Sequence, residues 1–263
     1  TKEAREYLIR QGEPKDKVKV MSFPLNKKFF EKVTRSREEI LNELGLDPGR
    51  KTLLATSGGQ GIGDTSSYVK KLYKSEFPFN IIAVCGKNRE LFDELSKLKD
   101  SVKSEVPLAV LGFVDNMHEL LEASDLAIAK GGASTTLEVL VKRVPTIFTH
   151  CAALHEKGNI DFCVDNKMGW YSKNKNEFNE IIDKIVNTDI LDQYKSNIEK
   201  NEYIKTLPEA ADNLARFIVK ELETPYVKHT RSKKVILRAI VLGTRINLYR
   251  LKSRNKNKRY KIE

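Results

Sequence analysis

The sequence predicts an α/β protein in which a parallel β-sheet is covered by helices on both faces. Short apolar runs rich in β-branched residues alternate with helical stretches of about ten residues. Two of these runs lead directly into glycine-rich turns. The length of 263 residues allows a sizeable core without disulfides or metals. The ordinary composition, 40% hydrophobic and 32% charged, excludes collagen-like, low-complexity and polytopic membrane proteins.

A helix, a strand and a second helix are expected ahead of the main sheet. The pattern predicts a helix over Lys2–Gln11 and a strand over Lys17–Ser22. A helix over Arg35–Leu44 follows, because its leucines and isoleucine recur at helical spacing. Gly45 is expected to end that helix.

The rest of the chain predicts a Rossmann-like domain from about Leu25 to about Thr224, because strands and helices alternate as in βαβ units. The expected strands are Lys51–Ser57, Asn80–Cys85, Leu108–Phe113, Asp125–Ala129, Pro145–Thr149 and Gly169–Tyr171. The expected helices are Ser66–Lys74, Arg89–Leu98, Met117–Ala123, Thr135–Lys142, Asn159–Asp165, Glu177–Val186 and Glu209–Glu221. Ligands of open α/β sheets bind at the carboxyl ends of the strands, so the loops there are the candidate sites.

The first candidate loop is glycine-rich and lies between a strand and a helix. It contains Gly58, Gly59, Gly61 and Gly63. Glycines let the backbone approach a phosphate closely, and a helix N-terminus supplies N–H donors. The loop fits neither the Walker A pattern nor Gly-x-Gly-x-x-Gly, so a plain tight turn is an equal interpretation.

The second candidate loop runs from Lys130 to Glu138, again between a strand and a helix. Ser134, Thr135 or Thr136 can cap the helix and face an anion. Glu138 is expected in the first helical turn, where its carboxylate can accept hydrogen bonds from a ribose diol. The alternative is a capping carboxylate favoured by the helix dipole.

The third candidate loop spans residues 150–159 and is rich in polar side chains. His155, Glu156 and Asn159 could reach a sugar or a phosphate. No second histidine lies four residues after His155, so the spacing excludes a helical zinc motif. The alternative is a surface loop in which Asn159 caps the next helix.

The fourth candidate loop, residues 112–117, suits a flat nucleobase because it combines an apolar edge with free backbone groups. Phe113 and Val114 supply that edge. The alternative places Phe113 in the core, with Asp115 or Asn116 as the cap of the following helix.

Together and in this order, the loops resemble one family. The series Gly-Gly-x-Gly, Gly-Phe-Val-Asp-Asn-Met, Lys-Gly-Gly-x-x-Thr-x-x-Glu, x-Pro-x-Ile and His-Glu-Lys-x-Asn resembles the C-terminal domain of a GT-B glycosyltransferase. It is most similar to family 28: the monogalactosyl- and glucosyl-diacylglycerol synthases, and the GlcNAc transferase of peptidoglycan lipid synthesis. The resemblance covers about Lys15 to about Lys220. Residues 1–24 resemble the end of the family's N-terminal domain and its interdomain linker.

The resemblance implies a UDP-sugar donor and assigns a role to each matching position. The diphosphate would contact glycines and hydroxyls, the uracil would lie on the backbone after the third main strand, and the ribose would meet a glutamate. The implied donor-binding residues are Gly59, Gly61, Phe113, Val114, Lys130, Gly132, Ser134, Thr135, Glu138, His155, Glu156 and Asn159. No metal and no cofactor is implied.

The resemblance also implies an inverting mechanism. Retaining GT-B enzymes carry a second glutamate eight residues before the ribose glutamate, and here that position is Lys130. The family's general base normally lies in the N-terminal domain, so no base is expected in this chain. Lipid synthases of the group usually have Gln-Glu where this chain has His155-Glu156, which leaves the sugar contacts open.

The last 38 residues are strongly basic. Residues 226–263 hold 13 Lys and Arg against Glu263 alone, a net charge of +12, whereas residues 1–225 hold 34 against 35 acids. Basic residues recur every seven positions from Arg231 to Lys252, which predicts an amphipathic helix on an anionic membrane surface over residues 231–252. The alternatives are a solubilising tail and a helix that packs on another domain. Few aromatic residues are available for base stacking, so nucleic acid is disfavoured.

The sequence therefore predicts a donor domain of a hexosyltransferase that acts on a lipid-linked acceptor such as diacylglycerol. Residues 25–224 would form this domain and residues 225–263 the basic tail. Three cysteines outside metal-ligand spacing and the absence of a signal peptide favour a cytoplasmic, peripherally membrane-associated protein. A competing interpretation is a non-catalytic nucleotide-sugar-binding subunit that needs a separate acceptor-domain partner. A more distant one is a nucleotide-sugar epimerase of the same architecture.

Overall fold

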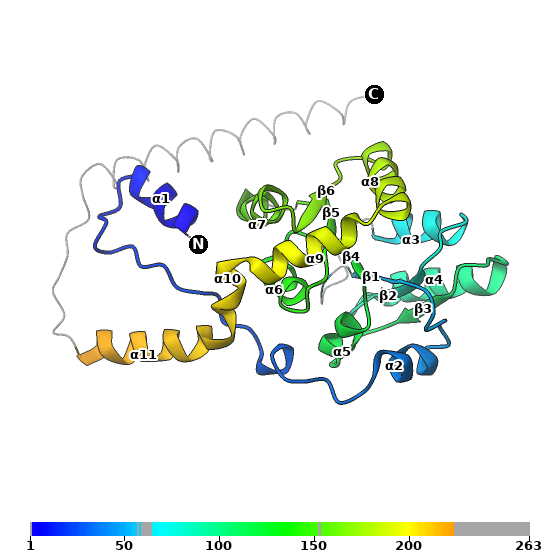
Figure 1. Ribbon diagram of the computed structural model, residues 1–263, viewed down its shortest axis with the longest axis horizontal. Coiled ribbons are helices and arrows are strands. Elements are labelled where there is room, and N and C mark those ends of the chain that lie inside the picture. The colour runs from blue at the N-terminus through cyan, green and yellow to red at the C-terminus, as the bar shows by residue number, and fades with distance from the viewer. Residues whose placement is uncertain (1, 57, 59–64, 152–153, 224–263) are drawn as a thin grey trace, which may run out of the picture. The chain divides into compact units, whose positions relative to one another are not determined.

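The structure is a computed structural model that describes residues 2–56, 58, 65–151 and 154–223. The chain divides into two compact units. The larger unit is Pro24–Glu209, and the described residues of the smaller unit are 2–23 and 210–223. Figure 1 labels the helices and strands of both units.

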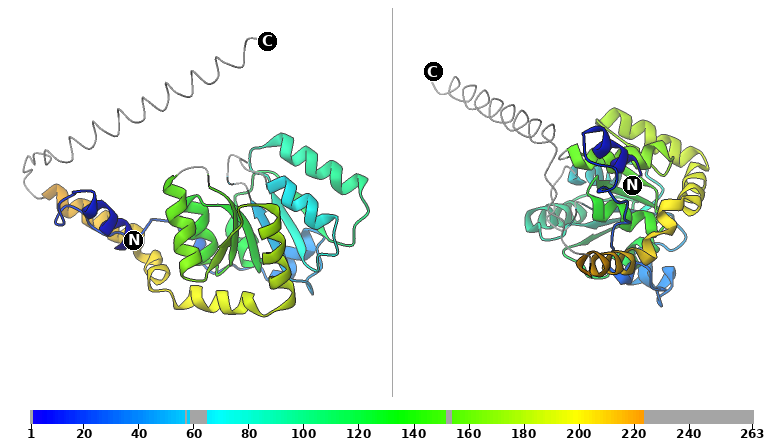
Figure 2. Two further views of the ribbon diagram at one scale, coloured as in Figure 1. Left: turned by 90° about the horizontal axis from the view of Figure 1, so that it is seen from above. Right: turned by 90° about the vertical axis from the view of Figure 1, so that its left-hand side faces the viewer.

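The larger unit is built on a parallel sheet of six strands in the order β3-β2-β1-β4-β5-β6. The strands are β1 (Thr52–Thr56), β2 (Asn80–Val84), β3 (Leu108–Leu111), β4 (Leu126–Lys130), β5 (Thr146–His150) and β6 (Gly169–Tyr171). Figures 1 and 2 show this sheet between helices on both sides. The prediction of a Rossmann-like parallel sheet with helices on both faces is confirmed.

Helices connect the strands and cover the sheet. They are η1 (Lys27–Phe29), α2 (Arg37–Glu43), α3 (Thr65–Tyr73), α4 (Arg89–Ser101), α5 (Met117–Glu122), α6 (Ala133–Val141), α7 (Leu154–Asp165), α8 (Lys175–Asn187), α9 (Ile190–Lys200), α10 (Glu202–Lys205) and η2 (Leu207–Glu209). The strand order reverses between β1 and β4, which is where open α/β sheets form a crevice at their carboxyl edge.

Successive residues of each strand enter two separate cores, because strand side chains alternate between the faces of a sheet. Leu53 and Ala55 of β1 pack with α3, α4 and α8, whereas Leu54 packs with α2, α5, α6 and α7. Both faces of the sheet are therefore filled by apolar contacts, as parallel sheets require. A ligand site is therefore expected in the loops at the ends of the strands and not on a face of the sheet.

Hydrogen bonds to one aspartate and one aromatic stack hold α2 and α9 against the sheet. Asp125, just before β4, accepts hydrogen bonds from the backbone N–H of Thr52 (2.9 Å), from Arg37 of α2 (2.9 Å) and from Lys195 of α9 (2.8 Å). Trp170 of β6 stacks on Tyr194 of α9 with ring centroids 4.1 Å apart. Together these contacts tie α2 and α9 to the sheet.

The smaller unit begins with α1 (Lys2–Arg10) and contains α11 (Ala210–Glu223). Arg5 of α1 donates hydrogen bonds to the carbonyl groups of Val18 (3.0 Å) and Lys15 (3.1 Å). The predicted strand over Lys17–Ser22 is wrong: residues 18–22 are not in a sheet. The carbonyl of Val18 is bonded to a side chain, and the described residues supply no neighbouring strand.

Most other predicted elements are confirmed, with ends shifted by a few residues. One start is wrong: α7 begins at Leu154, so the polar segment expected as a loop up to Asn159 is already helical. The helices α9 and α10 were not predicted at all. The division into units assigns α11 to the smaller one, and the predicted domain limits of residues 25 and 224 stay a prediction.

Candidate functional site

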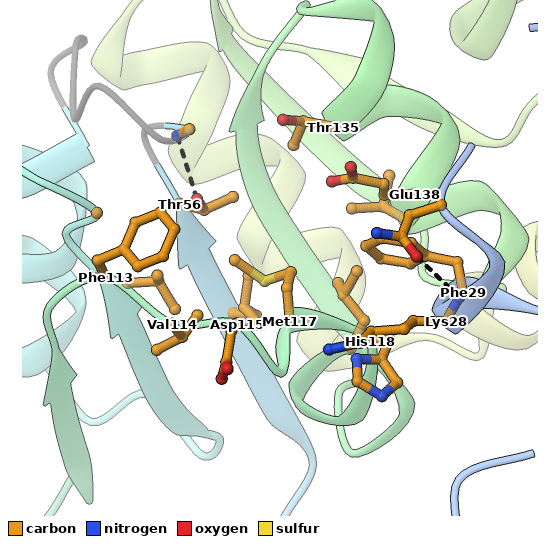
Figure 3. A pocket seen from close by; sticks show the side chains of 17 residues that line it. Lys28, Phe29, Thr56, Phe113, Val114, Asp115, Met117, His118, Thr135 and Glu138 are labelled. Carbon is orange, nitrogen blue, oxygen red and sulfur yellow. Dashed lines mark hydrogen bonds between the residues drawn. The ribbon is translucent and has the colours of Figure 1, made fainter. Parts of the chain in front are cut away.

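A cavity of about 360 Å³ lies at the carboxyl edge of the sheet, beside the reversal of strand order (Figure 3). Its walls come from the ends of β1 and β2, the loop after β3, α5, α6 and η1. The apolar lining residues are Phe29, Leu54, Val84, Phe113, Val114, Met117, Leu121 and Val139. A mainly apolar cleft with a few polar groups is the usual form of a small-molecule site.

Glu138 brings a carboxylate into this cavity from the second turn of α6 (Figure 3). Burial raises the pKa of this carboxyl group. Within the described residues, its side chain has no hydrogen bond and no ion pair. The expected position in the first turn is wrong, because α6 begins at Ala133, and so is the alternative of a helix cap. Its acceptor oxygens are available to a hydroxyl-bearing ligand.

The start of α6 also differs from expectation. Gly132 is its N-cap, and no side chain of the described residues caps it, so capping by Ser134, Thr135 or Thr136 is wrong. Thr135 lines the cavity, whereas Ser134 is exposed and does not. The amino end of α6 is therefore left to an external acceptor, which can be an anion.

The loop after β3 forms another wall. Phe113 is 63% exposed and lines the cavity with Val114 (Figure 3), so the alternative of a core phenylalanine is wrong. The Nζ of Lys87 lies 5.6 Å from the centre of the Phe113 ring. Asn116 occupies the N-cap position of α5, but its side chain makes no capping bond, and Asp115 lines the cavity.

A second group of residues, which we call the Lys130 cluster, borders the cavity: Lys130, Gly131, Gly132, Glu156 and Asn159. The Nζ of Lys130 lies 3.8 Å from Oε1 of Glu156. A methyl group on Gly58 or Gly132 would lie 3.5 or 3.6 Å from Cε of Lys130. Gly58 itself lines the cavity, so the cluster and the cavity share a wall.

Helix α7 supplies two members of the Lys130 cluster. Glu156 is 5% exposed, and Nδ2 of Asn159 donates a hydrogen bond of 2.8 Å to the carbonyl of Gly131. Asn159 lies inside α7, so its predicted role as a helix cap is wrong. His155 belongs to the same helix, and its side chain lies outside the described residues.

The model of the glycosyltransferase family 28 C-terminal domain matches residues 52–214, which is more than half of the chain. The chain belongs to this family. The predicted resemblance to family 28 is thereby confirmed.

Curated relatives of the family 28 domain are lipid glycosyltransferases by name. Monogalactosyldiacylglycerol synthase 1 of Arabidopsis thaliana is 29% identical over 66% of this chain and 33% of its own length. The processive diacylglycerol beta-glucosyltransferase of Staphylococcus epidermidis is 27% identical over 72% of this chain and 47% of its own length. The chain thus spans between a third and a half of these relatives.

Solved structures share the fold of the family 28 domain. MurG of Acinetobacter baumannii superposes with a TM-score of 0.57 at 20% identity, over 71% of this chain and 53% of that one. The Staphylococcus aureus MnaA–UDP complex superposes with a TM-score of 0.62 at 14% identity, over 88% and 61%. These likenesses confirm the fold as half of a GT-B architecture.

The structure gathers most of the predicted donor-binding residues of the family 28 domain into two adjoining places. Phe113, Val114, Thr135 and Glu138 line the cavity, and Lys130, Gly132, Glu156 and Asn159 form the neighbouring cluster. Ser134 belongs to neither. Gly59 and Gly61 lie outside the described residues.

Sequence reasoning missed the part of the cavity wall formed by Lys28, Phe29 and His118. Phe29 meets His118 edge-on, with ring centres 6.3 Å apart. The signal in the sequence was weak, because η1 is only three residues long and follows directly after the segment that resembles a linker. Asn26 caps it by accepting a hydrogen bond from the backbone N–H of Lys28. In the described ranges, no three His, Cys, Asp or Glu side chains gather as metal ligands. None of the helices in these ranges is long and apolar enough to cross a bilayer.

Proposed function

We propose that this chain binds the nucleotide of a UDP-sugar and serves as the donor domain of a glycosyltransferase that transfers a hexosyl group to a lipid acceptor such as diacylglycerol. The observation that carries the proposal is Glu138: a half-buried carboxylate in a largely apolar cavity at the strand-order reversal. A carboxylate in such a place needs donors, and the two hydroxyls of a ribose supply them. The proposed domain covers residues 25–224.

The proposed binding mode follows the lining of the cavity. The base lies against Phe113 and Val114, the ribose hydroxyls bind Glu138, and the diphosphate meets Thr135 and the amino end of α6. Lys130 supplies a positive charge from the adjoining cluster. Gly59, Gly61 and Ser134 are proposed diphosphate contacts, and His155 is a proposed sugar contact.

The proposed reaction is a direct displacement with inversion. An acceptor hydroxyl attacks the anomeric carbon, its proton passes to a general base outside this chain, and the bond from that carbon to the diphosphate oxygen breaks. Negative charge then grows on UDP. Lys130 and the α6 amino end stabilise that charge, which is the usual work of preorganised donors in an active site.

The names of the relatives support the choice of donor and acceptor. The staphylococcal relative is a diacylglycerol beta-glucosyltransferase, and the plant relatives are monogalactosyldiacylglycerol synthases. Among the proteins that share the fold, the MnaA structure is a complex with UDP and an Anabaena structure is a complex with UDP-glucose. We therefore propose that the donor is a uridine nucleotide sugar and that this half of the fold binds it.

Calorimetry with UDP, ADP and GDP tests the proposal. We expect UDP to bind more tightly than the other two, because the cavity wall at Phe113 and Val114 contacts the base edge. Equal binding of all three, or none, would contradict it. The competing interpretation, a non-catalytic nucleotide-sugar-binding subunit, predicts the same UDP preference but no hexosyl transfer to diacylglycerol, even from a longer protein that carries an acceptor domain.

We also propose that the basic tail holds the protein at an anionic membrane surface. The proposed lipid acceptor lies in a bilayer, so the enzyme has to reach the membrane surface. Residues 1–225 have almost no net charge that could attract the protein to an anionic surface. The tail, residues 225–263, lies outside the described residues, so its sequence alone supports this proposal. Each Lys or Arg near such a surface contributes about 1 kcal/mol before screening by salt.

A further inference from the structure

One wall of the cavity depends on a helix that is too short to be stable by itself. The helix α5 and the turn before it contribute a set of lining residues that we call the base wall: Phe113, Val114, Asp115, Met117 and His118 (Figure 3). The helix has only six residues, and isolated helices shorter than about 12 residues are marginal in water. The position of the base wall is therefore set by the contacts of α5 with other elements.

The apolar side of α5 is held by the core. Leu120 and Leu121 are buried in the same core as Phe29, and the Phe29 ring also meets His118 edge-on. These contacts hold the middle and the apolar side of the helix. The amino end, where the turn of the base wall joins the helix, is held by polar contacts.

Glu119, in the first turn of α5, connects that amino end to α2. Its Oε2 accepts a hydrogen bond of 3.0 Å from Nδ2 of Asn116 and one of 3.3 Å from Nη1 of Arg35. The side chain of Asn116 makes no capping bond, although the residue occupies the N-cap position, and it donates to Glu119 instead. Asn116 lies between two residues of the base wall, so this bond ties the wall to Glu119 and Arg35.

Arg35 is itself anchored by α2. It precedes Ser36, the N-cap of α2, whose hydroxyl accepts a hydrogen bond from the backbone N–H of Glu39 (3.1 Å), while the Glu39 carboxylate accepts one from the backbone N–H of Ser36 (2.6 Å). This capping box fixes the point at which the side chain of Arg35 leaves the backbone. The guanidinium then bridges Glu119 of α5 and Glu43 of α2.

We propose that Arg35 is a positioning residue for nucleotide binding, which acts through Glu119 and Asn116 to hold the base wall in place. The inference rests on the proposed function, in which the base lies against Phe113 and Val114. A wall that is held in its binding geometry loses less conformational freedom when the ligand arrives. Arg35, Glu119 and Asn116 are not among the described residues that line the cavity, so their effect on a nucleotide passes through the wall.

The first test measures the affinities of UDP and ADP by calorimetry on the full chain. We expect Arg35→Met to weaken UDP binding about fivefold, the size of a lost ion pair between partly exposed groups, and to leave ADP binding unchanged, because the wall fits the uracil. Glu119→Gln is expected to follow the same pattern. The double variant is expected to bind UDP no more weakly than either single variant, because both changes break one chain of contacts. Arg35→Lys keeps the positive charge and is expected to lose less affinity than Arg35→Met.

Arg50→Met is the matched control. The side chain of Arg50 is 37% exposed against 33% for Arg35, and its ion pair with Asp47 has the same N–O distance of 3.3 Å as the pair of Arg35 and Glu119. Arg50 precedes β1 and so lies at the edge of the sheet opposite the cavity. We expect this control to change neither affinity. Three results would overturn the inference: an unchanged UDP affinity in Arg35→Met; equal losses of UDP and ADP, which mark a general structural role; or additive losses in the double variant.

The second test needs no nucleotide. Amide hydrogen exchange of the full chain, read by mass spectrometry, is expected to be several-fold faster over residues 113–123 in Arg35→Met and Glu119→Gln than in the wild type or in Arg50→Met, and unchanged over β1. Unchanged exchange over residues 113–123, or a rise that extends to β1, overturns the positioning role, whatever the nucleotide data show. Faster exchange confined to residues 113–123, with a wild type that binds no UDP, upholds the role of Arg35 in holding the wall and overturns the proposed function alone.

Discussion

Glu138 combines a stabilising role in the proposed complex with a destabilising one in the empty protein. Burial raises the pKa of its carboxyl group, so the folded state holds the ionised form less readily than the unfolded chain does. A raised folded pKa favours folding at acidic pH, and this contribution is lost as the pH rises through the folded pKa. At neutral pH, above the pKa of the same group in the unfolded chain, the burial of Glu138 therefore costs the ligand-free protein folding free energy.

We expect Glu138→Gln to weaken UDP binding by about 1.5–3 kcal/mol, the range for a hydrogen bond to a charged group. The same variant is expected to melt at a higher temperature than the wild type when no ligand is present, because glutamine carries no ionisable group whose burial costs free energy. Calorimetry and thermal melts at pH 7 measure the two effects.

A 2′,3′-dideoxy analogue of UDP provides the control for Glu138. Without ribose hydroxyls, it is expected to bind the wild type and Glu138→Gln equally. A variant that keeps its UDP affinity would exclude Glu138 as the ribose ligand.

In Asp125, unlike Glu138, hydrogen bonds and nearby cations outweigh the effect of burial on the pKa. Burial opposes its ionisation, but hydrogen bonds from Lys195 and Thr52 and the charges of Lys195 and Arg37 outweigh burial and hold the pKa of Asp125 below its usual value. A lowered folded pKa stabilises the fold above the unfolded value, near 3.9, and this stabilisation is lost as the pH falls through the folded pKa.

We expect Asp125→Asn to reduce the free energy of unfolding by about 2–3 kcal/mol at pH 7, because two half-buried cations lose their shared partner. The difference from the wild type is expected to shrink below about pH 4, where the unfolded chain begins to take up the proton, and to be lost as the pH falls through the lower folded pKa of Asp125. Urea unfolding across pH measures it. A difference that does not change with pH would mean that only packing was lost.

At the scale of elements, the strands were easy to predict and α7 was not. The strands β1 and β2 are buried along their whole length, and β4 is buried up to its last residue, Lys130, so apolar runs mark all three in the sequence. The helix α7 begins with Leu154-His155-Glu156-Lys157-Gly158-Asn159, where polar residues and a glycine hide the helical pattern. The buried Glu156 takes a position where an apolar residue is expected.

The candidate site was predicted only in part for the same reason. Residues at or just after the ends of strands, such as Lys130 and Phe113, can be found from the alternation of elements alone. Lys28 and His118 reach the cavity from η1 and from the first turn of α5, and their placement depends on packing between elements that are distant in the chain. No local pattern encodes such a contact.

Two glycines, one inside α7 and one in the turn that packs on it, are expected to respond oppositely to substitution by alanine. Gly158 lies inside the helix, and a Cβ there would meet nothing within 4 Å, so Gly158→Ala is expected to stabilise the protein by about 0.5–1 kcal/mol. Gly131→Ala drives a methyl group into Ile160 and is expected to destabilise by about 1–3 kcal/mol, the usual range for overpacking. Chemical unfolding of both variants measures the contrast. Equal effects of the two changes would contradict the close contact between the turn and α7.

At the scale of the whole molecule, the distribution of charge separates a nearly neutral body from a basic end. Residues 1–225 hold 34 basic against 35 acidic residues, whereas residues 226–263 have a net charge of +12. We expect the full chain to sediment with liposomes that contain anionic lipid, and to be released as salt shortens the range of the attraction.

A chain cut after Thr224 is the control for the tail and is expected to stay in the supernatant, as is the full chain with neutral liposomes. Sedimentation that salt does not reverse, or no sedimentation at all, would contradict the electrostatic anchor. Tighter binding to DNA than to the liposomes at physiological salt would reassign the tail to nucleic acid.

The stack of Trp170 on Tyr194 gives this protein a built-in optical reporter, because Trp170 is the sole tryptophan of the sequence. Its emission follows the docking of α9 on the edge strand β6. The cavity is lined by β1, β2, the loop after β3, α5, α6 and η1, none of which contributes to this stack. We therefore expect that unfolding can be followed by fluorescence with a nucleotide bound, because Trp170 and Tyr194 do not line the cavity.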